Sequence, residues 1–172
     1  MAEFDRSLDS LSAEAYALAC AWIARCTARE VQVLIVQTSR TQAQHQVNFL
    51  AGTSSTQLSR HLPRKMRWPL DQPRPIPDPE RCDAVDLAPY AQYQLHGPDK
   101  LQWDTTDPAW GIIGEECERV GLRWGGRWLR PFDPGHGELI FPWTSQRVQE
   151  ERTRPWPYPR PLRPLASPPV QA

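Results

Sequence analysis

The proline distribution is the feature that most restricts the fold of this chain. Its 172 residues include 19 prolines, and these concentrate in two stretches. Residues 62–82 contain six of them, and residues 154–169 contain seven, with no acidic residue in the second stretch. Proline lacks an amide hydrogen and has a fixed φ, so neither stretch suits a helix or a central strand. We therefore predict one domain over residues 1–150 that carries a long surface loop at 62–82, followed by a disordered, Pro-rich tail at 151–172.

The charge balance excludes one class of function. The chain has 20 basic and 20 acidic residues, so its formal net charge is zero. A nucleic-acid-binding protein normally needs a basic excess to neutralise phosphates, and we expect no nucleic-acid partner. Within the Pro-rich tail, the segment Pro159–Pro161 resembles ligands of aromatic-lined grooves. A partner motif and a solvated tail with no partner both remain open for it.

The N-terminal apolar stretch and the cysteines bear on the compartment. Residues 15–24 are apolar, but acidic residues precede them where a signal peptide has positive charge. The stretch is also too short to span a bilayer, so we predict a buried helix, no signal peptide and no membrane insertion. None of the four cysteines forms a Cys-x-x-Cys pair, and we expect four reduced thiols in a protein kept in a cytoplasm.

Hydrophobic periodicity and capping residues predict three helices and four short strands. The helices are expected at about 12–28, 38–50 and 107–120, and the strands at 31–36, 84–87, 122–124 and 137–141. Ser10 or Ser12 is expected to cap the first helix. His45 falls within the second helix, and we expect it at the surface or at the rim of a site.

Two segments carry residues suited to a metal site. Asp86 lies in a predicted strand in which Val85 and Leu87 face one way and Asp86 the other, toward a cleft or solvent. Asp133 and His136 are three residues apart across a Pro-Gly turn, so they can converge on one point. A catalytic zinc takes three His, Asp or Glu ligands and leaves one position for water. From the residues alone, an aspartate that only accepts backbone hydrogen bonds and an ordinary surface turn remain open.

Several short motifs follow one another along the chain in a recognisable order. They are Thr38–Thr41, Gly52–Ser54, Ser59–His61, Asp83–Tyr90, Gly121–Trp128 and Asp133–His136. This ordered set resembles the D-alanyl-D-alanine carboxypeptidase and L-alanyl-D-glutamate endopeptidase family of zinc peptidases, which includes phage endolysins. The resemblance runs from about residue 31 to residue 141. It implies an α+β fold in which helices pack on one side of a small antiparallel sheet.

The resemblance also implies a role for each site residue. His61, Asp86 and His136 take the positions of the zinc ligands, and Asp133 takes that of the general base. Arg40 takes the position of the arginine that faces the substrate and stabilises developing negative charge. Glu138 is a rival for the base because it alternates with His136 along the final strand, although the motif favours Asp133.

This sequence departs from the family pattern in three places. The Pro-rich insertion at 62–82 separates His61 from Asp86, which are about seven residues apart in most relatives. Gly137 follows His136 where relatives usually carry an aromatic residue. A conventional Glu-Gln pair corresponds here to Gln44 and His45. The candidate walls of the cleft are three aromatic residues, Trp124, Trp128 and Tyr90. For Trp124, a position in the core is the alternative.

Three functions follow from the resemblance, and the first is preferred. It is a monomeric zinc endopeptidase that cuts the L-alanyl-D-glutamate bond of peptidoglycan stem peptides as a phage or prophage lysin. Such a lysin is expected to stay in the cytoplasm until a separate membrane pore releases it to the cell wall. The second is a D-alanyl-D-alanine carboxypeptidase or dipeptidase. The third is a non-catalytic cell-wall binding protein or phage-particle component with the same fold.

Overall fold

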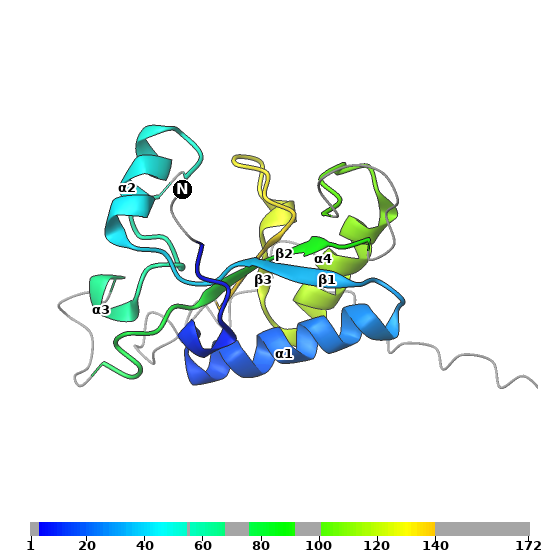
Figure 1. Ribbon diagram of the computed structural model, residues 1–172, viewed down its shortest axis with the longest axis horizontal. Helices are drawn as coiled ribbons and strands as arrows, with labels where there is room; N and C mark the ends of the chain where they lie inside the picture. Colours follow the sequence, from blue (N-terminus) through cyan, green and yellow to red (C-terminus); the bar gives the residue numbers. More distant parts are fainter. Residues whose placement is uncertain (1–3, 55, 68–75, 92–100, 140–172) are drawn as a thin grey trace, which may run out of the picture.

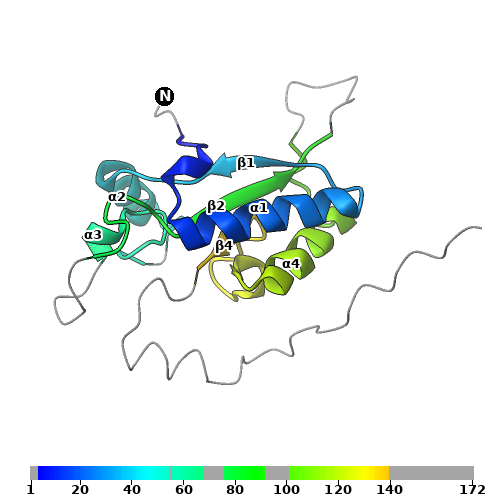
Figure 2. The same ribbon diagram turned by 90° about the horizontal axis from the view of Figure 1, so that it is seen from below.

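A four-stranded antiparallel sheet forms the centre of the molecule. The computed structural model describes residues 4–54, 56–67, 76–91 and 101–139. The sheet order is β1-β2-β4-β3, with bounds β1 (Val33–Gln37), β2 (Ala84–Pro89), β4 (His136–Glu138) and β3 (Arg123–Trp124). Two long helices, α1 (Ala13–Ala28) and α4 (Pro108–Val120), lie side by side on one face of the sheet (Figure 1, Figure 2). The predicted α+β class, with an antiparallel sheet and helices on one side, is confirmed.

Strand β2 separates the core from the candidate site. Val85 and Leu87 are fully buried in the hydrophobic core beneath α1 and α4, whereas Asp86 between them points to the other face and is only partly buried. Alternation of side chains along a strand produces this separation. The helix α2 (Gln42–Leu50) and the short 3₁₀ helix η2 (Gly125–Arg127) rise on the Asp86 side (Figure 1).

Trp22 of α1 fills the space beside Gly137 in the core. Its ring is fully buried, and its indole N–H donates to the carbonyl of Ile113 at 2.8 Å. A Cβ atom placed on Gly137 would lie 2.5 Å from the Trp22 ring and 3.0 Å from the sulfur of Cys117. The departure of Gly137 from the family pattern therefore has a physical reason, because an aromatic ring from α1 occupies the neighbouring space.

Helix α2 begins later than predicted, at Gln42 rather than near residue 38. Thr41 is the N-cap: its hydroxyl accepts from the amide of Gln44, and the Gln44 side chain accepts from the Thr41 amide. This reciprocal capping box starts the helix. The amide of Thr38 instead donates to the carbonyl of Asp5 at 2.7 Å, so Thr38 lies in a bend before the helix.

The Pro-rich insertion is partly helical and partly buried, which corrects the prediction of a surface loop without a helix. Pro63 leads directly into α3 (Arg64–Arg67), because proline is well tolerated at the start of a helix. Arg64 and Arg67 are buried, and both form ion pairs with the fully buried Asp83. Residues 68–75 of the insertion lie outside the described residues.

Asp83 joins this insertion to the N-terminal part of the chain. Ser12 is the N-cap of α1, as predicted, although its hydroxyl makes no capping bond and donates instead to Asp83 at 2.6 Å. The preceding 3₁₀ helix, η1 (Leu8–Ser10), leads into this contact. The loop at 62–82 is thus anchored where the chain enters β2.

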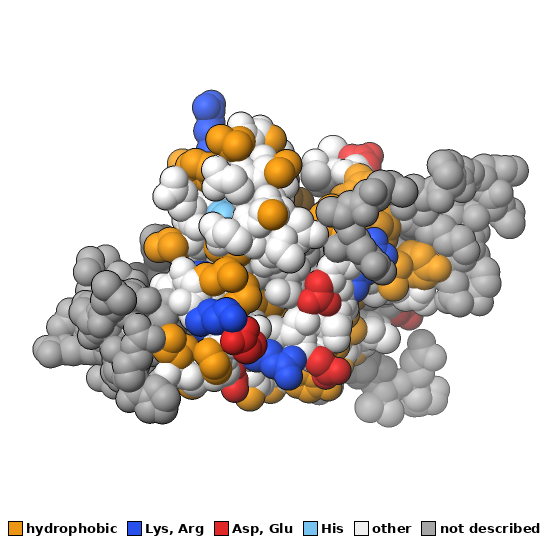
Figure 3. All heavy atoms as spheres, turned by 60° about the vertical axis from the view of Figure 1, so that its left-hand side comes forward, with side chains coloured by type: hydrophobic (Ala, Val, Ile, Leu, Met, Phe, Trp, Pro, Cys, Tyr) orange, Lys and Arg blue, Asp and Glu red, His pale blue; other side chains and the backbone are white. Residues whose placement is uncertain are grey.

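The cysteines and the surface of the described residues have two plain features. All four cysteines are free. Among the residues that the structure describes, no helix has the length and apolar character needed to cross a membrane. Basic and acidic side chains lie next to one another low on the face that carries α2 (Figure 3), in keeping with the zero net charge. The expected end of the last strand at 140–141 and the tail at 151–172 lie outside the described ranges.

Candidate metal centre

His61, Asp86 and His136 bring three ligand atoms to one point. Nε2 of His61 lies 3.1 Å from Oδ1 of Asp86 and 3.2 Å from Nδ1 of His136. Nδ1 of His136 lies 2.9 Å from the same Asp86 oxygen. His61 comes from the segment before the insertion, Asp86 from β2 and His136 from β4. Asp86 and His136 are directly opposite one another in the β2–β4 register, which explains their proximity.

The donor set fits a zinc ion. Tetrahedral zinc with bonds of about 2.0–2.2 Å has ligand atoms roughly 3.3–3.6 Å apart. The three observed separations are a few tenths of an ångström shorter, which small side-chain movements can supply. Two imidazole nitrogens and a carboxylate oxygen are all Lewis bases, so a shared cation relieves their mutual repulsion. Three protein ligands leave the fourth position open, as in catalytic zinc sites.

The ring of His61 is held by a backbone carbonyl. Its Nδ1 lies 2.5 Å from the carbonyl oxygen of Thr38, and the side chain is buried. A carbonyl oxygen can only accept, so Nδ1 carries the hydrogen and Nε2 presents its lone pair to the ligand cluster. The carbonyl of Thr38 therefore orients a candidate metal ligand.

The charges within the cluster are strongly coupled. Burial raises the pKa of Asp86, but the adjacent His61 and His136 lower it more, and the result is a pKa far below the ordinary value. Burial lowers the pKa of His136, whereas Asp86 and Glu138 raise it more, to about 10. Without a metal, the cluster therefore holds a proton on His136. A metal ion has to displace this proton when it binds.

Asp133 lies at the entrance to the same cluster, three residues before His136. Burial raises its pKa first, and the nearby Asp86 raises it further. A Cβ atom on Gly125 of η2 would lie 2.5 Å from the carbonyl oxygen of Asp133 and 2.9 Å from Cβ of His136. Only glycine allows the backbone of η2 to approach this turn so closely. Asp133 is thus a carboxylate with a raised pKa that lines the same cavity as His61 and His136.

Arg40 is oriented toward the site by β1. The side-chain oxygen of Gln37 accepts from Nε of Arg40 at 3.2 Å and from Nη2 at 2.6 Å. Gln37 stands opposite Asp86 at a shift in the β1–β2 register, and such a bulge can redirect a side chain. The amide of Arg40 also donates to the carbonyl of His61 at 2.9 Å. Arg40 and the ligand His61 therefore hold each other's backbone in place.

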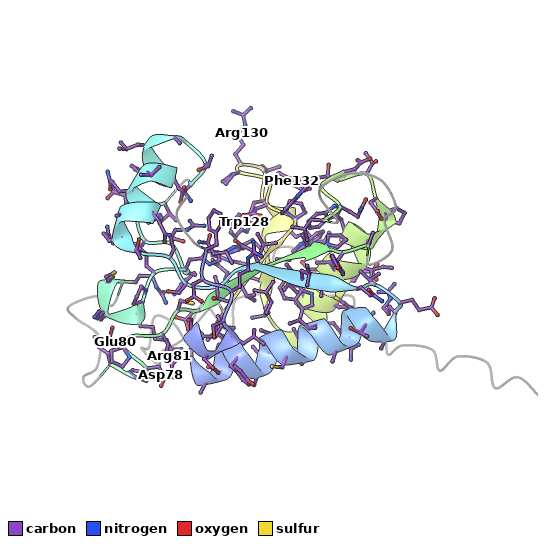
Figure 4. The ribbon with its side chains drawn as sticks, in the orientation of Figure 1. Asp78, Glu80, Arg81, Trp128, Arg130 and Phe132 are labelled. Carbon is purple, nitrogen blue, oxygen red and sulfur yellow. The ribbon has the colours of Figure 1, made fainter. Side chains whose placement is uncertain are left out.

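One cavity of about 520 Å³ opens onto the cluster. Its lining includes Asp133, Glu138, two ligand histidines and five arginines, namely Arg40, Arg60, Arg67, Arg123 and Arg130. Trp128 lines it too, and Arg130 extends away from the molecule at the tip of the loop that follows Trp128 (Figure 4). Positive charge therefore predominates around His61, Asp86 and His136. Apart from Arg40, the sequence gives no sign that these arginines meet, because Arg60 and Arg67 lie far along the chain from Arg123 and Arg130.

The structure separates the three aromatic candidates and corrects the position of His45. Trp128 lies against the cavity, and its ring centroid is 4.9 Å from that of His136. Trp124 instead packs against the core and donates to the carbonyl of Pro134 at 2.8 Å. Tyr90 pairs with Leu101 at the far end of β2 and does not line the cavity. His45 is only 2% exposed rather than a surface residue, because the side of α2 that carries it faces inward.

Comparison with known proteins bears on the site directly. Residues 82–139 match the D-alanyl-D-alanine carboxypeptidase family. The family resemblance is confirmed. The segment of this chain that matches contains Asp86, Asp133 and His136. Arg40 and His61 lie outside this segment, and the fold brings them to the site. The family match supports a peptidase.

The fold has also been seen in a solved structure. The L-Ala D-Glu endopeptidase ChiX of Serratia marcescens is similar with a TM-score of 0.51 and 18% sequence identity, over 81% of this chain and 90% of that chain. At this identity the similarity concerns the fold. A comparison with curated proteins finds no match.

Proposed function

We propose that the protein is a zinc-dependent peptidase that hydrolyses the L-alanyl-D-glutamate bond of peptidoglycan stem peptides. The observation that carries the proposal is the convergence of His61, Asp86 and His136 beside Asp133, in a cavity open to solvent. His61 lies outside the segment that matches the family, so its arrival at the site is independent support. We further propose that the protein acts as a monomeric phage or prophage lysin, kept in the cytoplasm until it is released to the cell wall.

The residues divide the work of hydrolysis between them. Bound zinc lowers the pKa of water and polarises a carbonyl group. Asp133 accepts a proton as the water oxygen attacks the scissile carbonyl carbon. It then delivers this proton to the leaving amine as the carbon–nitrogen bond breaks. The raised pKa of Asp133 suits both transfers, since a base needs a proton affinity close to the working pH.

Arg40 supplies fixed positive charge on the same side of the site. Burial lowers the pKa of Arg40, and the nearby carboxylates of Asp86 and Asp133 oppose this change. Gln37 holds it in place before the substrate arrives. A pre-oriented cation stabilises negative charge that develops on the carbonyl oxygen without first having to reorganise.

The charge of the cavity suits a stem peptide. Such peptides carry free carboxylates close to the scissile bond, and arginine binds carboxylates through paired hydrogen bonds. Arg67 is already paired with Asp83, and Arg123 with Glu138. The lining as a whole has five arginines against the carboxylates of Asp133 and Glu138, so an anionic peptide is favoured over a neutral or cationic one.

A D-alanyl-D-alanine carboxypeptidase is the second candidate, because the family that matches residues 82–139 carries that description. The two activities leave different products. We expect mass spectrometry of digested peptidoglycan to show free L-alanine-terminated strands and peptides with a new D-glutamate amino terminus. Release of single D-alanine with no new D-glutamate amino terminus would instead establish the carboxypeptidase. Binding without any cleavage by the zinc-loaded protein would support a non-catalytic wall-binding role.

A further inference from the structure

His136 has a second hydrogen-bond partner on the side away from the metal cluster. Its Nδ1 faces Asp86 and His61, and its Nε2 lies 3.0 Å from Oε2 of Glu138. Both side chains are almost fully buried, with 6% and 5% of their surface exposed. The two residues alternate along β4, which places their side chains on one face of the strand.

Glu138 is itself held by a cation from the neighbouring strand. Arg123 of β3 stands opposite Glu138 in the β3–β4 register, and its Nη2 pairs with Oε1 of the glutamate. One carboxylate oxygen therefore contacts Arg123, and the other contacts His136. Arg123 also lies over the ring of Trp128, at 5.7 Å from its centroid, and Trp128 packs against His136. Glu138 and Trp128 contact the imidazole, and Arg123 contacts both of them.

The two ligand histidines are thus oriented by different means. The outer nitrogen of His61 donates to a backbone carbonyl, at Thr38. The outer nitrogen of His136 donates to the Glu138 side chain. Carboxylates and carbonyls in this position keep the hydrogen on the outer nitrogen and leave the inner lone pair for the metal. Only the Glu138 contact can be removed by a substitution.

We propose that Glu138 is a positioning residue that fixes His136 for metal binding, that Arg123 holds Glu138 in place, and that Glu138 is not the general base. Both oxygens of Glu138 are engaged, and the contact with His136 is on the far side of the imidazole from the ligand cluster. Asp133 has neither restriction. The inference rests on the proposed metal site, and it assigns the residue that the sequence left as a rival for the base.

The test measures zinc affinity of the metal-free protein by competition with a chromophoric chelator, together with peptidoglycan hydrolysis at saturating zinc. Glu138→Gln retains an oxygen that accepts from His136 but cannot act as a base. Its single oxygen cannot also pair with Arg123, so we expect a zinc affinity between those of wild type and Glu138→Ala, with turnover retained at saturating zinc. Glu138→Ala removes the acceptor, and we expect its zinc affinity to fall about 10–100-fold. Glu118→Ala is the matched control, since the Glu118 side chain is only 7% exposed and pairs with an arginine but contacts no candidate ligand. This variant should bind zinc as wild type does.

Two results would overturn the inference while leaving the proposed function intact. One is a Glu138→Gln variant that binds zinc normally and has lost turnover, which identifies Glu138 as the base. The other is a Glu138→Ala variant with wild-type zinc affinity. If Glu138→Ala does not fold, Arg123→Ala, at a partly exposed side chain, provides the second measurement, and a zinc affinity equal to wild type in it contradicts the role of Arg123. Failure of the wild-type protein to bind zinc contradicts the proposed function itself.

Discussion

Asp83 offers the sharpest test of how the Pro-rich insertion is attached to the fold. Its carboxylate is fully buried, and it pairs with Arg64 and Arg67, whose side chains are 3% and 2% exposed. Asp83→Asn keeps the shape of the side chain and an oxygen for Ser12, but it removes the buried carboxylate that Arg64 and Arg67 share. Arg64 then keeps only a longer ion pair with the partly exposed Asp78, at 3.7 Å. Breaking a buried ion pair in this way costs about 3–5 kcal/mol of the free energy of unfolding. For a protein of this length that corresponds to a fall in Tm of roughly 6–20 °C.

The assay is thermal and urea-induced unfolding of both the variant and a matched control. The control is Glu80→Gln, since Glu80 forms an ion pair with Lys65 on the surface of the same insertion. Exposed pairs contribute about 0–1 kcal/mol, and the control should unfold close to wild type. If Asp83→Asn costs less than about 1 kcal/mol, or no more than the control, the insertion is not anchored through Asp83 and the reasoning is wrong.

Three further predictions concern the core, the base and the metal. Gly137→Ala forces a Cβ against the Trp22 ring and should lower the free energy of unfolding by about 1–3 kcal/mol in urea titrations. Gly111→Ala, on α4 with no atom within 4 Å of its new Cβ, should be neutral or slightly stabilising, and an equal loss in both variants refutes the explanation. Because burial raises the pKa of Asp133 above 3.8, the acid limb of kcat/KM at saturating zinc should lie above pH 3.8, and a flat profile down to pH 4 contradicts its role as base. Removal of the metal by a chelator should lower Tm. In the metal-free protein the pKa of His136 rises from 6.5 to about 10 on folding, so the stability that protonated His136 contributes is complete below pH 6.5 and is lost as the pH rises through about 10. A Tm that does not change with pH over this window argues against the charged cluster.

The parts of the fold that depend on local pattern could be predicted from the sequence. Alternation of Val85, Asp86 and Leu87 was sufficient to place β2 with its carboxylate away from the core, because side-chain direction in a strand follows sequence position. The sequence predicts the start of α2 too early, since Thr38 and Thr41 are both residues that can cap a helix. The choice between them is made by a contact of Thr38 with Asp5, more than thirty residues away along the chain.

Most of what the sequence could not show depends on contacts over long separations. The burial of Arg64 and Arg67 inside a Pro-rich segment follows from Asp83, and the proline pattern carries no sign of it. Gly137 was recognisable as unusual, but its reason, the Trp22 ring, lies on a distant helix.

In the site, ordered motifs predicted the residues that meet, and the geometry brings His61, Asp86 and His136 together as expected. The contact of Glu138 with His136 could have been anticipated from their alternation along one strand. The engagement of the other Glu138 oxygen by Arg123 could not, because it depends on the register of two strands.

Zinc content and peptidoglycan hydrolysis, measured together for three proteins, test the central claim most directly. We expect the wild type to bind about one zinc ion and to release new amino termini from purified peptidoglycan. Asp133→Asn should retain the zinc and lose turnover, whereas His136→Ala should lose both, because the first residue moves a proton and the second holds the metal. A wild-type protein that binds no zinc, or a His136→Ala variant that keeps both zinc and turnover, would contradict the account.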